Sequence, residues 1–134
     1  PLYNGDDEES EGIPNNVTKA AVRIQKSDYL IFALPEYNGL MPGVFKNLFD
    51  WVSRVRPMPW GGKKVLLISA SPSGFGRMRG FIHNRMPFES CGALVYPKSF
   101  FLANAYSAFD DKGKLKEKQL QKNLDDLLEG FFTF

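Results

Sequence analysis

Two runs of consecutive apolar residues constrain the fold more than any other feature of the chain. "DYLIFAL" occupies residues 28–34 and "KKVLLISAS" occupies residues 63–71. Their apolar side chains are continuous rather than alternating, which is typical of a parallel strand covered on both faces. A shorter run, "CGALVYP" at residues 91–97, predicts a third strand. We therefore expect a parallel sheet with helices packed against both of its faces.

Helical spacing of apolar side chains predicts a helix before the first strand and one after each strand. The first helix starts near Pro14 and ends near Lys26, and Pro42 suits the start of the second. The apolar positions by helix are Val17, Ala20, Ala21 and Ile24; Val44, Leu48 and Val52 with Phe45 and Phe49; Phe75, Met78, Ile82 and Met86; and Leu120, Leu124, Leu127, Leu128 and Phe131. We interpret residues 1–14 as an acidic surface loop and residues 98–114 as a long connection. Strands alternating with helices predict the α/β class.

Composition narrows the range of functions. The 134 residues are 24% charged and 43% hydrophobic, and the net charge is +2, with the basic residues scattered along the chain. This pattern argues against nucleic-acid binding, which needs a clustered basic surface. One cysteine (Cys91) and one histidine (His83) exclude an intrachain disulfide and make metal binding or nucleophilic catalysis poor candidates. No apolar run is long enough for a membrane span.

The loop "PEYNG" at residues 35–39 follows the first long strand. Ligands of parallel α/β sheets bind beyond the carboxyl ends of the strands, which is where this loop is expected. Pro35 ends the strand, and Gly39 permits a turn that other residues resist. The freed backbone groups suit a flat heterocycle with donors and acceptors on its rim, while Tyr37 offers an apolar plane. A tight β–α turn without a ligand explains the same residues equally well.

The loop "SPSGFG" at residues 71–76 follows the second long strand and is expected at the same edge. Gly74 and Gly76 flank Phe75 and permit a close approach of the backbone to a ligand. A simple β–α turn is again an alternative. Neither a dinucleotide fingerprint nor a Walker-A loop occurs in the chain.

The stretch "PEYNG" followed by "MPGVFKNLFDWVSR" resembles the motif of the NADPH-dependent FMN reductase family, the flavodoxin-like quinone, chromate and azo-dye reductases. The matching positions of the second part are Pro42, Gly43, Lys46, Asn47, Asp50, Trp51 and Arg54. "ISASPSGFGRMRG" is similar to the family's second flavin loop, and "AFDDKGKL" to its lead into the last helix. Ser73 and Arg77 stand where the family commonly has glycine.

The resemblance implies a flavodoxin-like three-layer α/β/α sandwich with a parallel sheet in the order 2-1-3-4-5. Because "PLYN" is similar to the end of the family's second strand, residues 1–134 are expected to be one domain that is incomplete at its N-terminus and holds strands 3–5. The phosphate loop would then precede it. Independently, "YLIFAL" as an unpaired edge strand would be long and apolar, a feature that natural edges avoid.

The resemblance also implies an NAD(P)H-dependent FMN oxidoreductase that passes electrons to quinones, chromate, azo compounds or similar small molecules. FMN would be the cofactor, NADPH or NADH the co-substrate, and the protein a cytoplasmic homodimer or homotetramer. Because flavin carries out the chemistry, no catalytic side chain is expected. The implied cofactor-binding residues are Pro35, Glu36, Tyr37, Asn38, Gly39, Ser71, Gly74, Phe75 and Gly76.

Alternatives remain open at this point both for the function and for the roles of single residues. A flavodoxin-type electron carrier and a flavin-free dimerisation module would share the fold. Glu36 is equally well explained as a solvated acid or as a subunit contact. Asp50, Trp51 and Arg54 are assigned to packing or to the dimer interface rather than to chemistry.

Overall fold

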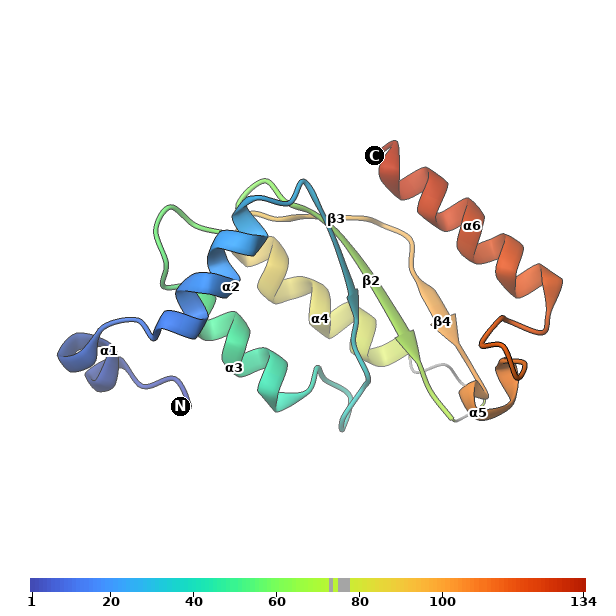
Figure 1. The fold of residues 1–134 in the computed structure, drawn as a ribbon, viewed down its shortest axis with the longest axis horizontal. Helices are drawn as coiled ribbons and strands as arrows, with labels where there is room; N and C mark the ends of the chain where they lie inside the picture. The colour runs from blue at the N-terminus through green and yellow to red at the C-terminus, as the bar shows by residue number, and fades with distance from the viewer. Residues whose placement is uncertain (73, 75–77) are drawn as a thin grey trace.

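A computed structural model describes residues 1–72, 74 and 78–134 and has the expected α/β architecture (Figure 1). Its parallel sheet contains β1 (Tyr29–Ala33), β2 (Lys64–Ala70), β3 (Leu94–Val95) and β4 (Phe100–Leu102). β2 is the central strand: β1 pairs with one of its edges, while β3 and β4 share the other. The parallel sheet predicted from the two apolar runs is therefore confirmed.

β3 and β4 together form one interrupted strand along β2. β3 pairs with Lys64 and Val65, and β4 pairs with Ile68 to Ala70 further along. The prediction that residues 98–114 form only a connection is wrong, because they contain β4 and the short helix α5 (Ala105–Ala108). Pro97 lies between the two pieces and lacks an N–H for the ladder, which interrupts the pairing. The polar residues Lys98 and Ser99 follow it, so no continuous apolar run marks the strand.

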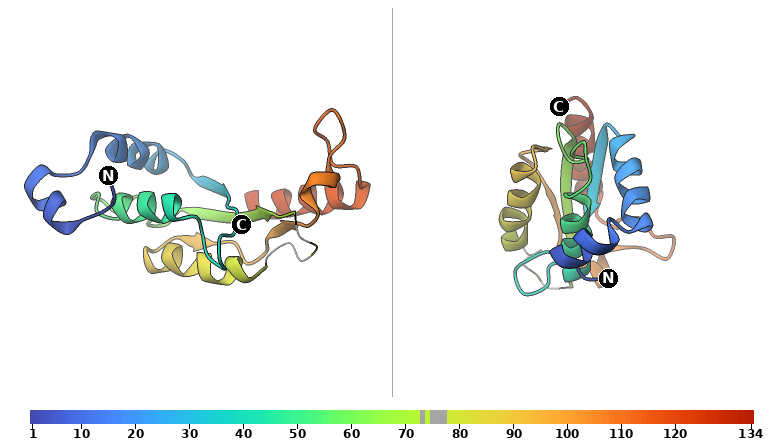
Figure 2. Two further views of the ribbon diagram at one scale, coloured as in Figure 1. Left: turned by 90° about the horizontal axis from the view of Figure 1, so that it is seen from below. Right: turned by 90° about the vertical axis from the view of Figure 1, so that its left-hand side faces the viewer.

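Helices cover the two faces of the sheet unequally. α2 (Asn15–Gln25), α3 (Gly43–Val52) and α4 (Met78–Ser90) lie on one face, and α6 (Lys118–Phe132) lies on the other (Figures 1 and 2). The alternation of β2 side chains explains the two cores: Val65 and Leu67 join the three-helix side, and Leu66 joins α6 through Leu127 and Phe131.

The acidic segment near the start is helical rather than a loop, which corrects the interpretation of residues 1–14. α1 (Gly5–Glu11) is capped by Asn4, whose side-chain oxygen accepts a hydrogen bond from the backbone N–H of Asp6. Acidic residues fill its first turn, where the positive end of the helix dipole stabilises them. α1 buries no residue and projects at the end of the molecule away from α6 (Figure 1).

Some predicted apolar stripes are exposed. On α3, Val44 is 81% exposed, whereas Phe49 and Val52 are buried. On α4, Ile82 and Met86 are 65% and 63% exposed, and the helix instead turns Asn84 and Phe88 toward the core. The spacing rule located both helices but, applied to apolar residues alone, chose the wrong face of α4 because a buried asparagine lies on the correct one.

The expectation that β1 is covered on both faces is only half fulfilled. Leu30 and Phe32 pack against the three-helix side. On the opposite face α6 reaches Tyr29, but Ile31 is 43% exposed and Ala33 is exposed as well. The edge of β1 away from β2 pairs with no strand among the described residues.

Candidate functional site

The loop at the carboxyl end of β1 is a tight reverse turn. The N–H of Tyr37 donates to the carbonyl of Leu40 at 2.9 Å, and the N–H of Leu40 donates back to the carbonyl of Tyr37 at 3.1 Å. Between them Asn38 has φ 54° and Gly39 has φ 85°. Positive φ at both central residues is the signature of a type I′ turn, for which Asn-Gly is the preferred pair.

This turn presents unpaired donors and an aromatic face at the surface. Among the described residues, no hydrogen bond engages the backbone N–H of Asn38 or of Gly39. The Tyr37 side chain is 62% exposed, and Pro35 and Asn38 are exposed too. Backbone donors beside an apolar plane are what a flat heterocycle with rim acceptors requires. The geometry of residues 35–39 therefore suits a flat heterocyclic ligand.

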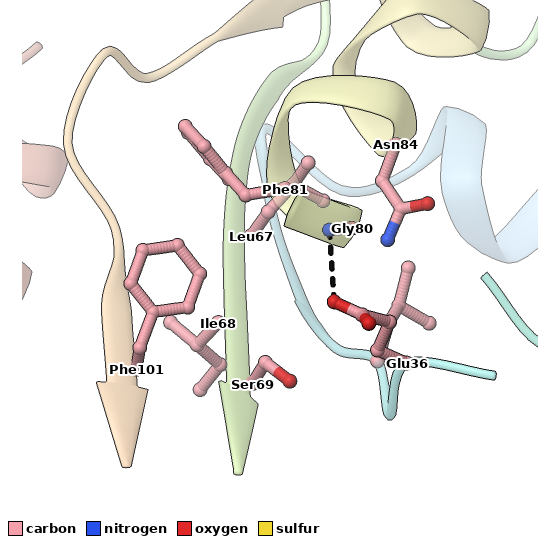
Figure 3. A pocket seen from close by; sticks show the side chains of 9 residues that line it. Glu36, Leu67, Ile68, Ser69, Gly80, Phe81, Asn84 and Phe101 are labelled. Carbon is pink, nitrogen blue, oxygen red and sulfur yellow. Dashed lines mark hydrogen bonds between the residues drawn. The ribbon is translucent and has the colours of Figure 1, made fainter. Parts of the chain in front are cut away.

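Glu36 departs from its neighbours by turning inward. Its carboxylate Oε2 accepts a hydrogen bond from the backbone N–H of Gly80 at 2.9 Å, at the start of α4 (Figure 3). The Glu36 side chain is half-buried, whereas Pro35 and Tyr37 on either side are exposed. It therefore links the loop after β1 to the helix after β2.

The loop after β2 is anchored by its first residue. Ser71 is buried; its N–H donates to the carbonyl of Leu102 at 2.8 Å, and its carbonyl accepts from the N–H of Ala105 at 3.0 Å. Gly74 is exposed, and a Cβ built on it would have the Oδ1 of Asn104 as its nearest atom, at 4.0 Å. The predicted residues Phe75 and Gly76, like Ser73 and Arg77, lie outside the described residues.

Two residues that sequence reasoning missed lie at this edge of the sheet. The first is Gly80, whose N–H donates to Glu36. The second is Asn84, which lies one turn further along α4 and is only 5% exposed. The Oδ1 of Asn84 and the Oγ of Ser69 have no hydrogen-bond partner among the described residues. Figure 3 shows both side chains beside Glu36 at a small cavity. A lone glycine inside a helical pattern was the available signal for Gly80, since it often marks a close contact.

Neither the histidine nor the cysteine lines the cavity beside Glu36. His83 is exposed on α4. Burial raises the pKa of the Cys91 thiol, so the unreactive thiol form is favoured. Across residues 1–72, 74 and 78–134, no group of three histidine, cysteine, aspartate or glutamate side chains is placed to hold a metal ion. Over the same residues, no helix has the length and apolar character needed to cross a membrane.

Two helix N-termini complete the electrostatics of the edge. α3 begins at Gly43 after the β1 loop, and α4 begins at Met78 after the β2 loop. Their first-turn N–H groups and dipoles carry partial positive charge toward the carboxyl ends of the strands. Such an edge favours ligands that carry negative charge. One of these donors, the N–H of Gly80, is already hydrogen-bonded to Glu36.

Comparison with known proteins gives concordant matches. A family model described as NADPH-dependent FMN reductase matches residues 1–107. An NAD(P)H-dependent FMN reductase of Pseudomonas aeruginosa is 35% identical over 96% of this chain and 70% of its own length. A quinone reductase of Escherichia coli is 36% identical over 76% of this chain and 54% of its own length. The chain thus spans between about half and 70% of these two curated relatives.

A solved structure has the same fold over nearly the whole chain. FerB, a flavoenzyme NAD(P)H:(acceptor) oxidoreductase from Paracoccus denitrificans, superposes with a TM-score of 0.83 at 26% identity. The match covers 98% of this chain and 72% of FerB. The arrangement of strands and loops described above is therefore that of a flavodoxin-like protein.

Proposed function

Because the chain belongs to the NADPH-dependent FMN reductase family, we propose that it is part of an NAD(P)H-dependent FMN oxidoreductase that passes electrons to quinones, chromate, azo compounds or similar acceptors. The observation that carries the proposal is the type I′ turn at residues 37–40, whose unpaired N–H groups lie beside an exposed tyrosine. A bound FMN would supply the hydride and electron transfer. The residues of this chain would bind and orient the flavin and exclude water from it.

We assign the residues of the turn to the rim of the flavin ring. The N–H groups of Asn38 and Gly39 would donate to ring acceptors, and the Tyr37 ring would pack on the flavin or the acceptor. The second side of the ring is assigned to the loop after β2 and the start of α4. The residues proposed there are Ser71, Gly74, Phe75 and Gly76. No side chain is assigned a proton-transfer role.

We also propose that, in the full-length protein, a further strand pairs with the open edge of β1 and a further helix covers its exposed face. The support is the free edge of β1 and the exposure of Ile31 and Ala33, which is unusual for the middle and end of an apolar strand. The two curated relatives are longer than this chain, which leaves room for such an additional part. The phosphate of FMN would be bound by that additional part.

The proposal extends to assembly and location. Exposed apolar side chains on α3 and α4 suit a homodimer or homotetramer: Val44, Leu48, Ile82 and Met86. The nicotinamide co-substrate is an intracellular reductant, so we place the enzyme in the cytoplasm. The physiological acceptor is a small molecule that reaches the edge formed by residues 35–39.

The test is made with the full-length protein, purified and examined for bound FMN by its visible absorption. We expect tightly bound or readily incorporated FMN, and NAD(P)H oxidation that accelerates on addition of a quinone. Flavin binding without NAD(P)H oxidation would instead identify an electron carrier. A colourless protein that takes up no added FMN would identify a flavin-free module and contradict the proposal.

A further inference from the structure

Glu36 joins the two segments that are proposed to bind flavin. Its Oε2 accepts the N–H of Gly80 at 2.9 Å, although the two residues are 44 positions apart (Figure 3). Gly80 is the third residue of α4. N–H groups in the first turn of a helix have no intrahelical acceptor, so a carboxylate both satisfies one and complements the helix dipole.

The contact depends on glycine at position 80. A Cβ built on Gly80 would lie 3.0 Å from both the Cγ and the Oε2 of Glu36. That separation is tighter than ordinary van der Waals contact, so a side chain there would push the carboxylate away. Gly80 is also buried, so its N–H is shielded from water where it donates to Glu36.

The surroundings leave Glu36 little freedom to move. The cavity beside it is small, about 10 Å³, and its lining includes Ser69 of β2 and Phe81 and Asn84 of α4. That space holds about one water molecule. The carboxylate therefore has little room to move further into the protein, and the hydrogen bond to Gly80 contributes to holding it in place.

We infer that Glu36 is a positioning residue that holds the loop at residues 35–39 at a fixed separation from the start of α4. The inference rests on the proposed function, because the separation matters only if both segments contact the same ring. With the carboxylate in place, the turn and the helix present their donors to the ring together. Without the carboxylate, the turn loses this hydrogen bond to α4. Part of the free energy of flavin binding must then be spent on ordering the turn.

Three substitutions in the full-length protein test this role. Glu36→Ala removes the acceptor, Glu36→Gln keeps an oxygen that can accept from Gly80, and Gly80→Ala displaces the carboxylate by steric contact. Glu117→Ala is the control for loss of a negative charge, because Glu117 is exposed and its side chain makes no capping hydrogen bond. Denaturation midpoints identify any variant that has lost its fold.

The first measurement is amide hydrogen exchange without flavin, which does not depend on activity. Glu36→Ala should accelerate exchange at Gly80 about tenfold, the factor that corresponds to a charge-assisted hydrogen bond of about 1.4 kcal/mol. Residues 36–40 should accelerate with it. Glu36→Gln and Glu117→Ala should remain within about threefold of the wild type. Unchanged exchange in Glu36→Ala would overturn the inference.

The second measurement is the dissociation constant for FMN. Glu36→Ala and Gly80→Ala should each raise it about tenfold, and Glu36→Gln should restore it to within about threefold of the wild type. Faster exchange with an unchanged dissociation constant would overturn the positioning role but leave the proposed function intact. A wild-type protein that binds no FMN would overturn the proposed function itself, and the positioning role with it.

Discussion

At the scale of single residues, the sequence predicts local backbone geometry but not hydrogen bonds between residues far apart in the chain. The Asn-Gly pair at residues 38–39 indicates a tight turn because positive φ is a property of those two residues alone. The inward turn of Glu36 was not predictable, because its partner Gly80 lies on another element. Glutamate is compatible with a solvated loop, a subunit contact or an internal tie, and only the fold distinguishes these.

Gly39 provides a prediction about the turn. Gly39→Ala places a Cβ at φ 85°, a conformation that costs an alanine about 1 kcal/mol. We expect the turn to shift toward other conformations and the dissociation constant for FMN in the full-length protein to rise about fivefold or more, as measured by fluorescence titration.

Gly62 is the matched control for this substitution. It has φ 70° and, like Gly39, nothing within 4 Å of an added Cβ, but it precedes β2 at the opposite end of the strand. Gly62→Ala should cost similar stability and leave flavin affinity unchanged. Equal effects of the two substitutions on affinity would mean that residues 35–39 do not contact the ring.

At the scale of elements, continuous apolar runs predicted the strands well and interrupted ones poorly. β1 and β2 are single runs, whereas β3 and β4 have two and three residues and are separated by a segment that contains Pro97. Similarly, α4 was located by spacing, but its core face includes a buried amide. Apolar patterning alone does not identify a helix face on which a buried amide takes the place of an apolar side chain.

On helix α3, the family motif includes Asn47 and Trp51, and the structure shows what these two side chains contact. The Oδ1 of Asn47 accepts from the N–H of Tyr3 at 2.8 Å, and its Nδ2 donates to the carbonyl of Pro1 at 3.0 Å. The Nε1 of Trp51 donates to the same carbonyl at 3.1 Å. These side chains fix the segment at residues 1–3 along α3, in agreement with a packing role for Trp51.

Asn47→Ala should therefore lower the free energy of unfolding of the full-length protein by about 1–3 kcal/mol, because it leaves the N–H of Tyr3 without its acceptor and removes one donor to the carbonyl of Pro1. Chemical denaturation measures the change. The neighbouring Lys46→Ala breaks an exposed ion pair with Asp50 and should cost about 0.5 kcal/mol or less. Equal costs would contradict this account of the helix.

At the scale of the whole molecule, the sheet differs between β2, which is paired on both edges, and β1, which is paired on one. β2 is paired on both edges, and Val65, Leu66 and Leu67 are almost fully buried. β1 has a similar apolar sequence, but one of its edges pairs with no strand in the described part of the chain, and Ile31 is 43% exposed. An apolar strand in this state favours association with another strand, so its environment in the full-length protein should differ from its environment in residues 1–134.

The substitution Ile31→Lys should consequently have opposite effects in two contexts. In a protein limited to residues 1–134, a lysine on the open face of β1 should reduce self-association, as measured by light scattering, because charge opposes edge pairing. In the full-length protein, where we propose that this face is covered, the same lysine should lower the free energy of unfolding by about 3 kcal/mol or more. Val22→Lys on α2 is the control, since Val22 is 40% exposed and no further coverage is proposed there; it should change stability by less than about 0.5 kcal/mol in both contexts. If Ile31→Lys is as harmless as Val22→Lys in the full-length protein, the exposed face of β1 stays in contact with solvent, which would contradict the proposed covering helix.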